Sequence, residues 1–268
     1  MCTSCGCGDE VASDHHHHDQ EAHDHDHGAP HHHHHQHPDR AARTVRIERD
    51  LLAKNTRIAR ETRRAAADRQ IALFNLIGSP GAGKTALLEA TIRRLRVHVP
   101  LAVLEGDQAT DRDAKRIESA GCRVVQINTG AGCHLDASMI EAGLRGIAPP
   151  RSSIVFVENV GNLVCPALFD LGELAKIVVM SVTEGEDKPL KYPHVFRAAE
   201  MMVLTKTDLL PHLAFDADRC VAYARQVNPR LQVIRLSATR GDSVDAFCGW
   251  VQAEALRAWT GSPEATAS

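Results

Sequence analysis

Eight consecutive residues, Gly78-Ser79-Pro80-Gly81-Ala82-Gly83-Lys84-Thr85, match the phosphate-binding pattern G-x-x-x-x-G-K-S/T. They follow an apolar run at 71–77 and precede the helix-forming residues Ala-Leu-Leu-Glu at 86–89, which is the setting this loop requires. The glycines let the backbone approach a phosphate chain, and the N–H groups at the helix start face the anion. Lys84 supplies charge to the terminal phosphates, and the Thr85 hydroxyl can ligate Mg²⁺. The pattern predicts nucleoside triphosphate binding by Gly78, Ser79, Gly81, Ala82, Gly83, Lys84 and Thr85.

Apolar runs alternate with helical patterns from residue 71 onward. Strands are expected at 71–77, 101–105, 123–127, 154–157, 177–182, 203–205 and 233–236, and helices at 85–94, 111–120, 135–144, 216–227 and 243–258. Because these strands are continuously apolar rather than alternating, the sheet should be buried on both faces, mostly parallel and doubly wound. Residues 71–268 are therefore expected to form one α/β domain that binds ligands at the carboxyl ends of its strands.

Acidic residues close two of the predicted strands. Asp107 follows the second strand, where it could hold Mg²⁺ or orient the attacking water, whereas nearby Glu105 is read as a strand cap. Glu158 ends an apolar strand, as the acidic residue of a Walker-B motif does. Gly161 comes three residues later and offers an amide that can sense a γ-phosphate. Lys84, Asp107 and Glu158 are the candidate catalytic residues.

Residues at the ends of two further strands indicate which base the nucleotide carries. Thr205-Lys206-Thr207-Asp208 resembles the guanine-recognition motif N/T-K-x-D. The two acceptor oxygens of Asp208 match the N1–H and N2–H₂ donors of guanine, and Lys206 would lie along the base. Ser237 and Ala238 fit the companion guanine loop. In this order at successive strand ends, the motifs favour GTP over ATP and predict a P-loop GTPase.

Residues 1–39 have the composition of a disordered metal-binding tail, with eight acidic residues and no Lys or Arg. Cys2, Cys5 and Cys7 can wrap one soft metal ion. Planar coordination with nitrogen donors would suit Ni²⁺, and a closed tetrahedral site would suit Zn²⁺. The sequence therefore does not decide between the two metals. Thirteen of the 17 histidines follow at 15–37 and are interpreted as a metal reservoir.

Residues 40–70 form a basic helical segment with ten Lys/Arg against four Asp/Glu. The thin apolar stripe predicted for it, Ile47, Leu51, Ile58, Thr62 and Ala65, favours packing on the domain, with docking of a partner protein as the second interpretation. No aromatic residues interleave with the charges, so nucleic acid is not expected as a partner. No run is long enough for a membrane span and no secretory signal is present, so a cytoplasmic location without membrane association is predicted.

Three further metal donors lie inside the α/β domain. Cys133 and His134 are adjacent in a glycine-flanked loop, and Cys165 follows Gly161 by four residues. A metal shared by these side chains would respond to the nucleotide state. Cys122, Cys220 and Cys248 are without such neighbours in the sequence and are assigned to the core.

The complete pattern resembles the HypB family of GTPases, which help insert nickel into nickel–iron hydrogenase. The resemblance rests on the terminal Cys-x-x-Cys-x-Cys, the histidine tract, the phosphate loop, and the stretches at 159–166 and 184–193. It implies a tight nickel site at Cys2, Cys5 and Cys7, and a weaker Ni²⁺ or Zn²⁺ site at Cys133, His134 and Cys165. It also implies slow GTP hydrolysis, a GTP-dependent homodimer, and two partners, a HypA-type nickel chaperone and the hydrogenase large-subunit precursor.

The sequence departs from the family pattern at two points. Thr205 replaces the usual Asn of the guanine motif, and no Gln follows Gly161 to position water.

Two other functions compete with this interpretation. One alternative is a urease-type maturation GTPase, which typically carries a Cys-Pro-His motif instead of the adjacent Cys133-His134. The other is a metal storage protein with secondary nucleotide binding, which the tail alone would support.

Overall fold

A computed structural model describes residues 38–107, 112–130, 132 and 134–261, excluding the side chains of 38–48 and Asp107. The cysteine cluster, the histidine tract and Cys133 lie outside the described residues. The chain divides into two units, Met1–Asp50 and Leu51–Ser268, and helix α1 (Pro38–Asp68) crosses their boundary. Among the described residues, no helix combines the length and hydropathy that a membrane crossing needs.

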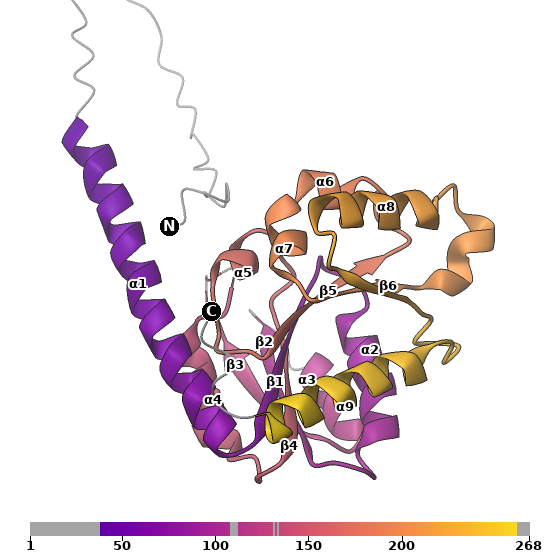
Figure 1. Ribbon diagram of the computed structural model, residues 1–268, viewed down its shortest axis with the longest axis horizontal. Helices are drawn as coiled ribbons and strands as arrows, with labels where there is room; N and C mark the ends of the chain where they lie inside the picture. The colour runs from indigo at the N-terminus through magenta and orange to yellow at the C-terminus, as the bar shows by residue number, and fades with distance from the viewer. Residues whose placement is uncertain (1–37, 108–111, 131, 133, 262–268) are drawn as a thin grey trace, which may run out of the picture. The chain divides into compact units, whose positions relative to one another are not determined.

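The described part of the second unit is built on a seven-stranded sheet with the order β3-β2-β4-β1-β5-β6-β7 (Figure 1). Every pair of neighbouring strands is parallel, so the predicted doubly wound parallel sheet is confirmed. Strand β1 lies at the centre of the sheet, between β4 and β5. The strands are β1 (Ile71–Ile77), β2 (Leu101–Asp107), β3 (Arg123–Asn128), β4 (Ser153–Glu158), β5 (Ala175–Ser181), β6 (Met201–Thr205) and β7 (Gln232–Arg235).

Helices cover both faces of the sheet and bury separate hydrophobic clusters. Helices α2 (Lys84–Leu95), α3 (Arg112–Ser119) and α9 (Val244–Thr260) pack on the face that includes Phe74 and Phe156. On the opposite face, α4 (Ala137–Ile147) packs over the β1, β2 and β4 part of the sheet, while α7 (Pro193–Ala198) and α8 (Ala217–Val227) pack over β5 and β6. Both faces of the central strands are thus buried, which explains their unbroken apolar sequences.

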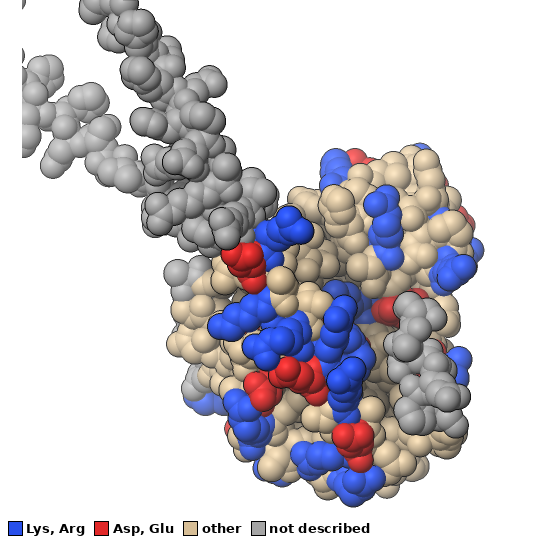
Figure 2. Space-filling model, turned by 60° about the vertical axis from the view of Figure 1, so that its left-hand side comes forward, with Lys and Arg blue, Asp and Glu red and all other residues tan. Residues whose placement is uncertain are grey.

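The buried stripe of α1 shares Thr62 with the predicted one and otherwise differs from it. Asn55, Ala59, Thr62 and Ala66 are buried at helical spacing, whereas Leu51 is 57% exposed and Ala65 is exposed. The chain passes close to this stripe at Gly172, where a Cβ would lie 2.7 Å from the Ala59 carbonyl oxygen, so this approach needs glycine. Basic side chains gather on the outer face of the molecule that includes α1 (Figure 2).

Short helices that the sequence pattern did not predict lie among the loops at the carboxyl ends of the strands. They are α5 (Cys165–Leu168), α6 (Lys188–Lys191), α7 and the 3₁₀ helix η1 (Thr207–His212). Helices α5, α6 and α7 each have proline at one of the first two helical positions, where its missing N–H is not needed. Elements of four to six residues are too short to give a periodic apolar signal.

Candidate nucleotide and metal site

The phosphate-binding loop joins β1 to α2 at the centre of the sheet. Gly83 caps α2 with φ 97°, a left-handed conformation that glycine adopts without strain. The Lys84 ammonium is buried in the loop, 3.3 Å from the Gly78 carbonyl oxygen and 3.4 Å from that of Ser79. Burial lowers the pKa of Lys84, while the Glu158 carboxylate opposes this shift. The loop thus positions a cation at the end of the central strand.

Thr85 and Glu158 form the second part of this site. The Thr85 hydroxyl donates a hydrogen bond of 2.7 Å to Glu158 Oε1, and Glu158 Oε2 is buried with no hydrogen-bond partner among the described residues. Burial raises the pKa of Glu158 to about 7, and Lys84 and Thr85 act in the opposite direction. A hydroxyl beside an unsatisfied buried carboxylate oxygen is the donor chemistry that Mg²⁺ prefers. These two residues therefore fit the cation that the phosphate loop implies.

Two acidic residues of β2 lie at the same edge of the sheet. Glu105, the expected strand cap, is in register with Glu158 on the neighbouring strand β4 and is buried beside it. Asp107 closes β2, and its side chain lies outside the described residues. Asp113 at the start of α3 acts electrostatically on both Lys84 and Glu158, a proximity that the sequence did not indicate.

Gly161 packs directly against the phosphate loop. A Cβ at Gly161 would lie 2.8 Å from Pro80 Cγ and 3.0 Å from the Pro80 nitrogen, so only glycine fits. The next residue, Asn162, forms an isolated β-bridge with Gly78. The segment that follows β4 is therefore held on the loop expected to bind the phosphates.

The guanine motif also reaches this loop. The Thr205 hydroxyl donates to the Ala82 carbonyl oxygen at 2.6 Å, and Lys206 Nζ donates to that of Gly81 at 2.7 Å. Lys206 has φ 58°, which turns the chain sharply at the end of β6. Sequence spacing gave no sign of these contacts, because they join residues more than a hundred positions apart.

The two predicted guanine loops are neighbours. The Thr207 amide donates to the Leu236 carbonyl oxygen at 3.3 Å, which brings the Asp208 segment next to Ser237 and Ala238. Ser237 is buried, and its hydroxyl accepts a hydrogen bond of 3.2 Å from the Arg240 amide, closing a tight turn. Strand order has thus placed both loops at one side of the phosphate loop.

The metal candidates within the domain are described only in part. Cys165 is buried and begins α5, and the His134 ring stacks on Phe169, the residue that caps α5, with centroids 3.9 Å apart. Burial lowers the pKa of His134, which favours the neutral imidazole that ligates metals. Cys133 lies outside the described residues, and among the described ones no group of three or more His, Cys, Asp or Glu side chains is arranged for a metal ion.

Cys122, Cys220 and Cys248 are buried with free thiols, as expected for core residues. Burial raises the pKa of Cys122 and of Cys220 to about 12, and that of Cys248 to about 11. These thiols are therefore protonated at neutral pH and unsuited to binding metal.

Lys188 is a further cation at the phosphate loop. Its Nζ lies 2.5 Å from Ser79 Oγ and forms an ion pair with Glu184, and it sits 5.9 Å from the centre of the Tyr192 ring. The resemblance to the HypB family implies that Lys188 contacts the nucleotide site of a second subunit, which stays a prediction. Its contact with Ser79 of its own chain is one that the sequence did not indicate.

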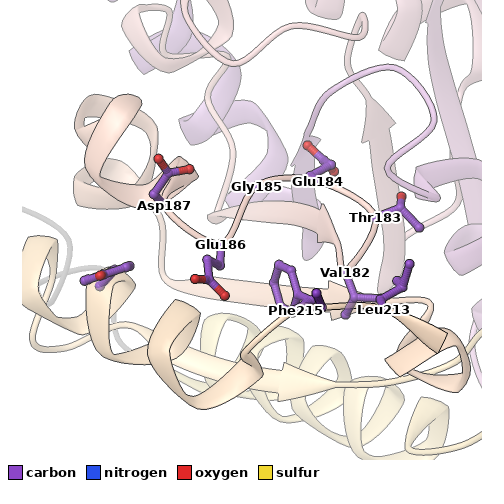
Figure 3. A pocket seen from close by; sticks show the side chains of 10 residues that line it. Val182, Thr183, Glu184, Gly185, Glu186, Asp187, Leu213 and Phe215 are labelled. Carbon is purple, nitrogen blue, oxygen red and sulfur yellow. The ribbon is translucent and has the colours of Figure 1, made fainter. Parts of the chain in front are cut away.

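A hollow of about 500 Å³ opens behind this charged run (Figure 3). Its lining comes from residues 182–187 and 213–215 together with Tyr223. Glu186 joins two segments at the hollow, because its carboxylate accepts a hydrogen bond from the Asp216 amide at 2.8 Å and forms an ion pair with Arg219 at 2.7 Å. These lining residues are not those of the phosphate loop, so the hollow lies outside the predicted nucleotide site.

The parallel sheet, the phosphate loop and the two neighbouring guanine loops define a P-loop GTPase. Residues 72–235 match the family model "CobW/HypB/UreG, nucleotide-binding domain". The chain belongs to the HypB family of hydrogenase maturation factors. It is 54% identical to hydrogenase maturation factor HypB of Azotobacter vinelandii over 211 residues, which cover 79% of this chain and 70% of the relative.

Two solved structures are also similar to this chain. HypB from Helicobacter pylori in complex with nickel has a TM-score of 0.72 and 33% identity, covering 78% of this chain and 99% of that one. HypB from Archaeoglobus fulgidus has a TM-score of 0.71 and 34% identity, and the match covers 76% of this chain and 99% of that one.

Proposed function

We propose that this protein is a GTP-hydrolysing nickel metallochaperone that delivers nickel to the hydrogenase large-subunit precursor. The observation that carries the proposal is that one short segment holds both the candidate metal ligand Cys165 and the candidate phosphate sensor Gly161. Gly161 packs on Pro80 of the phosphate loop, and the buried Cys165 begins the next helix. The nickel complex of the Helicobacter pylori relative supports nickel as the cargo.

In the proposal, each candidate residue has a role in GTP hydrolysis. The loop amides and Lys84 bind the phosphates, and Lys206, Asp208, Ser237 and Ala238 bind the guanine base. Thr85 and Glu158, with Asp107, would hold Mg²⁺, which supplies charge neutralisation on the phosphates. Asp107 or Glu158 orients the attacking water, and Gly161 senses the γ-phosphate. With no Gln after Gly161, we expect hydrolysis to be slow.

Nickel is the substrate that this cycle moves. In the proposal, Cys2, Cys5 and Cys7 hold one ion tightly and the histidine tract stores further ions. Cys133, His134 and Cys165 form a weaker site for Ni²⁺ or Zn²⁺ at a dimer interface that GTP favours. The partners are a HypA-type nickel chaperone and the hydrogenase precursor, and the location is cytoplasmic.

Complementation of a hydrogenase-maturation mutant tests this function. Lys84→Ala should lower GTP hydrolysis by about 100-fold or more, because one phosphate-stabilising cation is lost, and should abolish hydrogenase activity. Arg230→Ala is the matched control, since Arg230 is an exposed cation outside the site. A chain without residues 1–37 should lose activity chiefly when nickel is scarce.

The alternative functions predict other outcomes of the same test. A storage protein would tolerate Lys84→Ala and fail only without its tail. A urease-type maturation factor would restore urease rather than hydrogenase activity. Either result would contradict the proposed function.

A further inference from the structure

Asn159 occupies the turn between β4 and the Gly161 segment, and its side chain joins two loops. It is 1% exposed. Its Oδ1 accepts hydrogen bonds from the Val160 amide at 3.0 Å and from the Leu135 amide at 3.4 Å. Val160 precedes the candidate phosphate sensor, and Leu135 follows the candidate metal ligand His134. One carbonyl oxygen therefore contacts the backbone of both functional segments.

The amide of Asn159 is fixed from its other end. Its Nδ2 donates to Asn75 Oδ1 at 3.2 Å, and Asn75 Nδ2 donates to Glu173 Oε1 at 3.2 Å. Asn75 is fully buried in β1, the strand that leads into the phosphate loop. Because the amide plane is anchored to the centre of the sheet, a shift of the Val160 amide strains the bond to Leu135 or moves it as well.

A shift at Leu135 reaches the segment that carries Cys165. The His134 ring, adjacent in sequence, stacks on Phe169 at 3.9 Å with an angle of 26° between the ring planes. Phe169 caps the four-residue helix that begins at Cys165. The described contacts thus run without a gap from the Gly161 segment to both His134 and Cys165.

We propose that Asn159 is a positioning residue that couples the phosphate sensor to the His134 segment. Contact of a γ-phosphate with the Gly161 segment then changes the placement of His134 relative to Cys165, and metal binding at His134 acts back on the Gly161 segment, as linkage requires. This inference rests on the proposed function, because it needs a GTPase whose domain carries a metal site.

Nickel affinity in two nucleotide states tests the coupling. Ni²⁺ is titrated into the full chain with GDP or a non-hydrolysable GTP analogue bound. The same titrations of His134→Ala, which keeps residues 1–39, measure Ni²⁺ binding to the tail, and the binding that this variant loses gives the affinity of the domain site in each state. The ratio of the two domain-site affinities reports coupling within the domain. We expect a ratio of about 5 or more in the wild type. Asn159→Ala should bring the ratio close to 1 while GDP affinity changes by less than about 3-fold.

Two variants control for structural damage. Asn228→Ala removes an asparagine whose side chain likewise makes three hydrogen bonds, to Phe196 O, Ala199 O and the Arg230 amide. These bonds lie away from both loops, so the variant should keep the wild-type ratio. Asn159→Asp keeps the accepting Oδ1 but loses the donor to Asn75, and it should retain more of the ratio than Asn159→Ala. If Asn159→Ala keeps the full ratio, Asn159 is not the coupling residue. If the wild type binds Ni²⁺ with equal affinity in both nucleotide states, the proposed function fails as well.

Hydrogen exchange on the wild type tests the inference even if Asn159→Ala does not fold. The Leu135 and Val160 amides share one acceptor, so their exchange rates should change together between the two nucleotide states. A change at Val160 with a constant rate at Leu135 would overturn the coupling.

Discussion

The Thr205 hydroxyl lies 2.6 Å from the Ala82 carbonyl oxygen and donates a hydrogen bond to it. Thr205 heads the predicted guanine motif and Ala82 belongs to the phosphate loop, so this bond joins the two halves of the predicted nucleotide site. A second bond, from the same hydroxyl to the Met180 carbonyl oxygen at 3.2 Å, ties the motif to β5. Threonine in place of the usual asparagine therefore has a structural function here, and its presence is compatible with a guanine site.

Replacing the Thr205 hydroxyl should weaken nucleotide binding. Thr205→Val keeps the side-chain shape but leaves the buried Ala82 carbonyl oxygen without this donor, which costs about 1–3 kcal/mol. We expect GDP affinity to fall by about 10-fold, measured by fluorescent nucleotide titration. Thr205→Ser keeps the hydroxyl and should stay near the wild-type affinity. Equal affinities of the Val and Ser variants would show that the bond does not support the loop.

Asp208 should set the preference for GTP over ATP. Removing its two acceptor oxygens in Asp208→Ala leaves the N1–H and N2–H₂ donors of guanine unpaired, a type of loss that costs several kcal/mol in a buried site. Competition of GTP and ATP for the site should show the preference falling by about 100-fold or more. If the variant keeps the preference, another residue reads the base.

A methyl group at Gly161 should disturb the phosphate loop. Gly161→Ala places a Cβ 2.8 Å from Pro80 Cγ, so one of the two segments must move, at a cost of about 1–3 kcal/mol. We expect slower GTP hydrolysis and a lower melting temperature. Gly146→Ala is the matched control, because a Cβ at Gly146 in α4 meets nothing within 4 Å and alanine favours the helix. Unchanged hydrolysis in Gly161→Ala would remove this segment from the mechanism.

The core thiols should resist alkylation in the folded protein. With pKa values of about 12, Cys122 and Cys220 hold only about one thiolate in ten thousand at pH 8, and burial excludes the reagent. Iodoacetamide treatment followed by mass spectrometry should label these two residues and Cys248 only after unfolding. Labelling of any of them in the native state would contradict their placement in the core.

The sequence predicted the features that arise from local pattern. Residues 71–85 encode a buried strand, a glycine-rich turn and a helix start in one stretch, and Glu158 ends a strand whose apolar run shows its burial. The sequence did not indicate contacts between distant residues, such as Thr205 with Ala82 or Asn159 with Leu135. Such hydrogen bonds depend on strand order, which periodicity does not fix. The buried stripe of α1 includes Thr62, as predicted, but otherwise differs for the same reason, because the segment at Gly172 that lies against Ala59 is distant in sequence.

The proposed function requires that nucleotide and nickel act on each other through this domain. The most direct test measures the affinities of the wild-type chain for GDP and for a non-hydrolysable GTP analogue, with and without Ni²⁺. We predict that Ni²⁺ changes the ratio of these two affinities by about 5-fold or more, as a coupling free energy of at least about 1 kcal/mol requires. A ratio that Ni²⁺ leaves unchanged within error would contradict the claim.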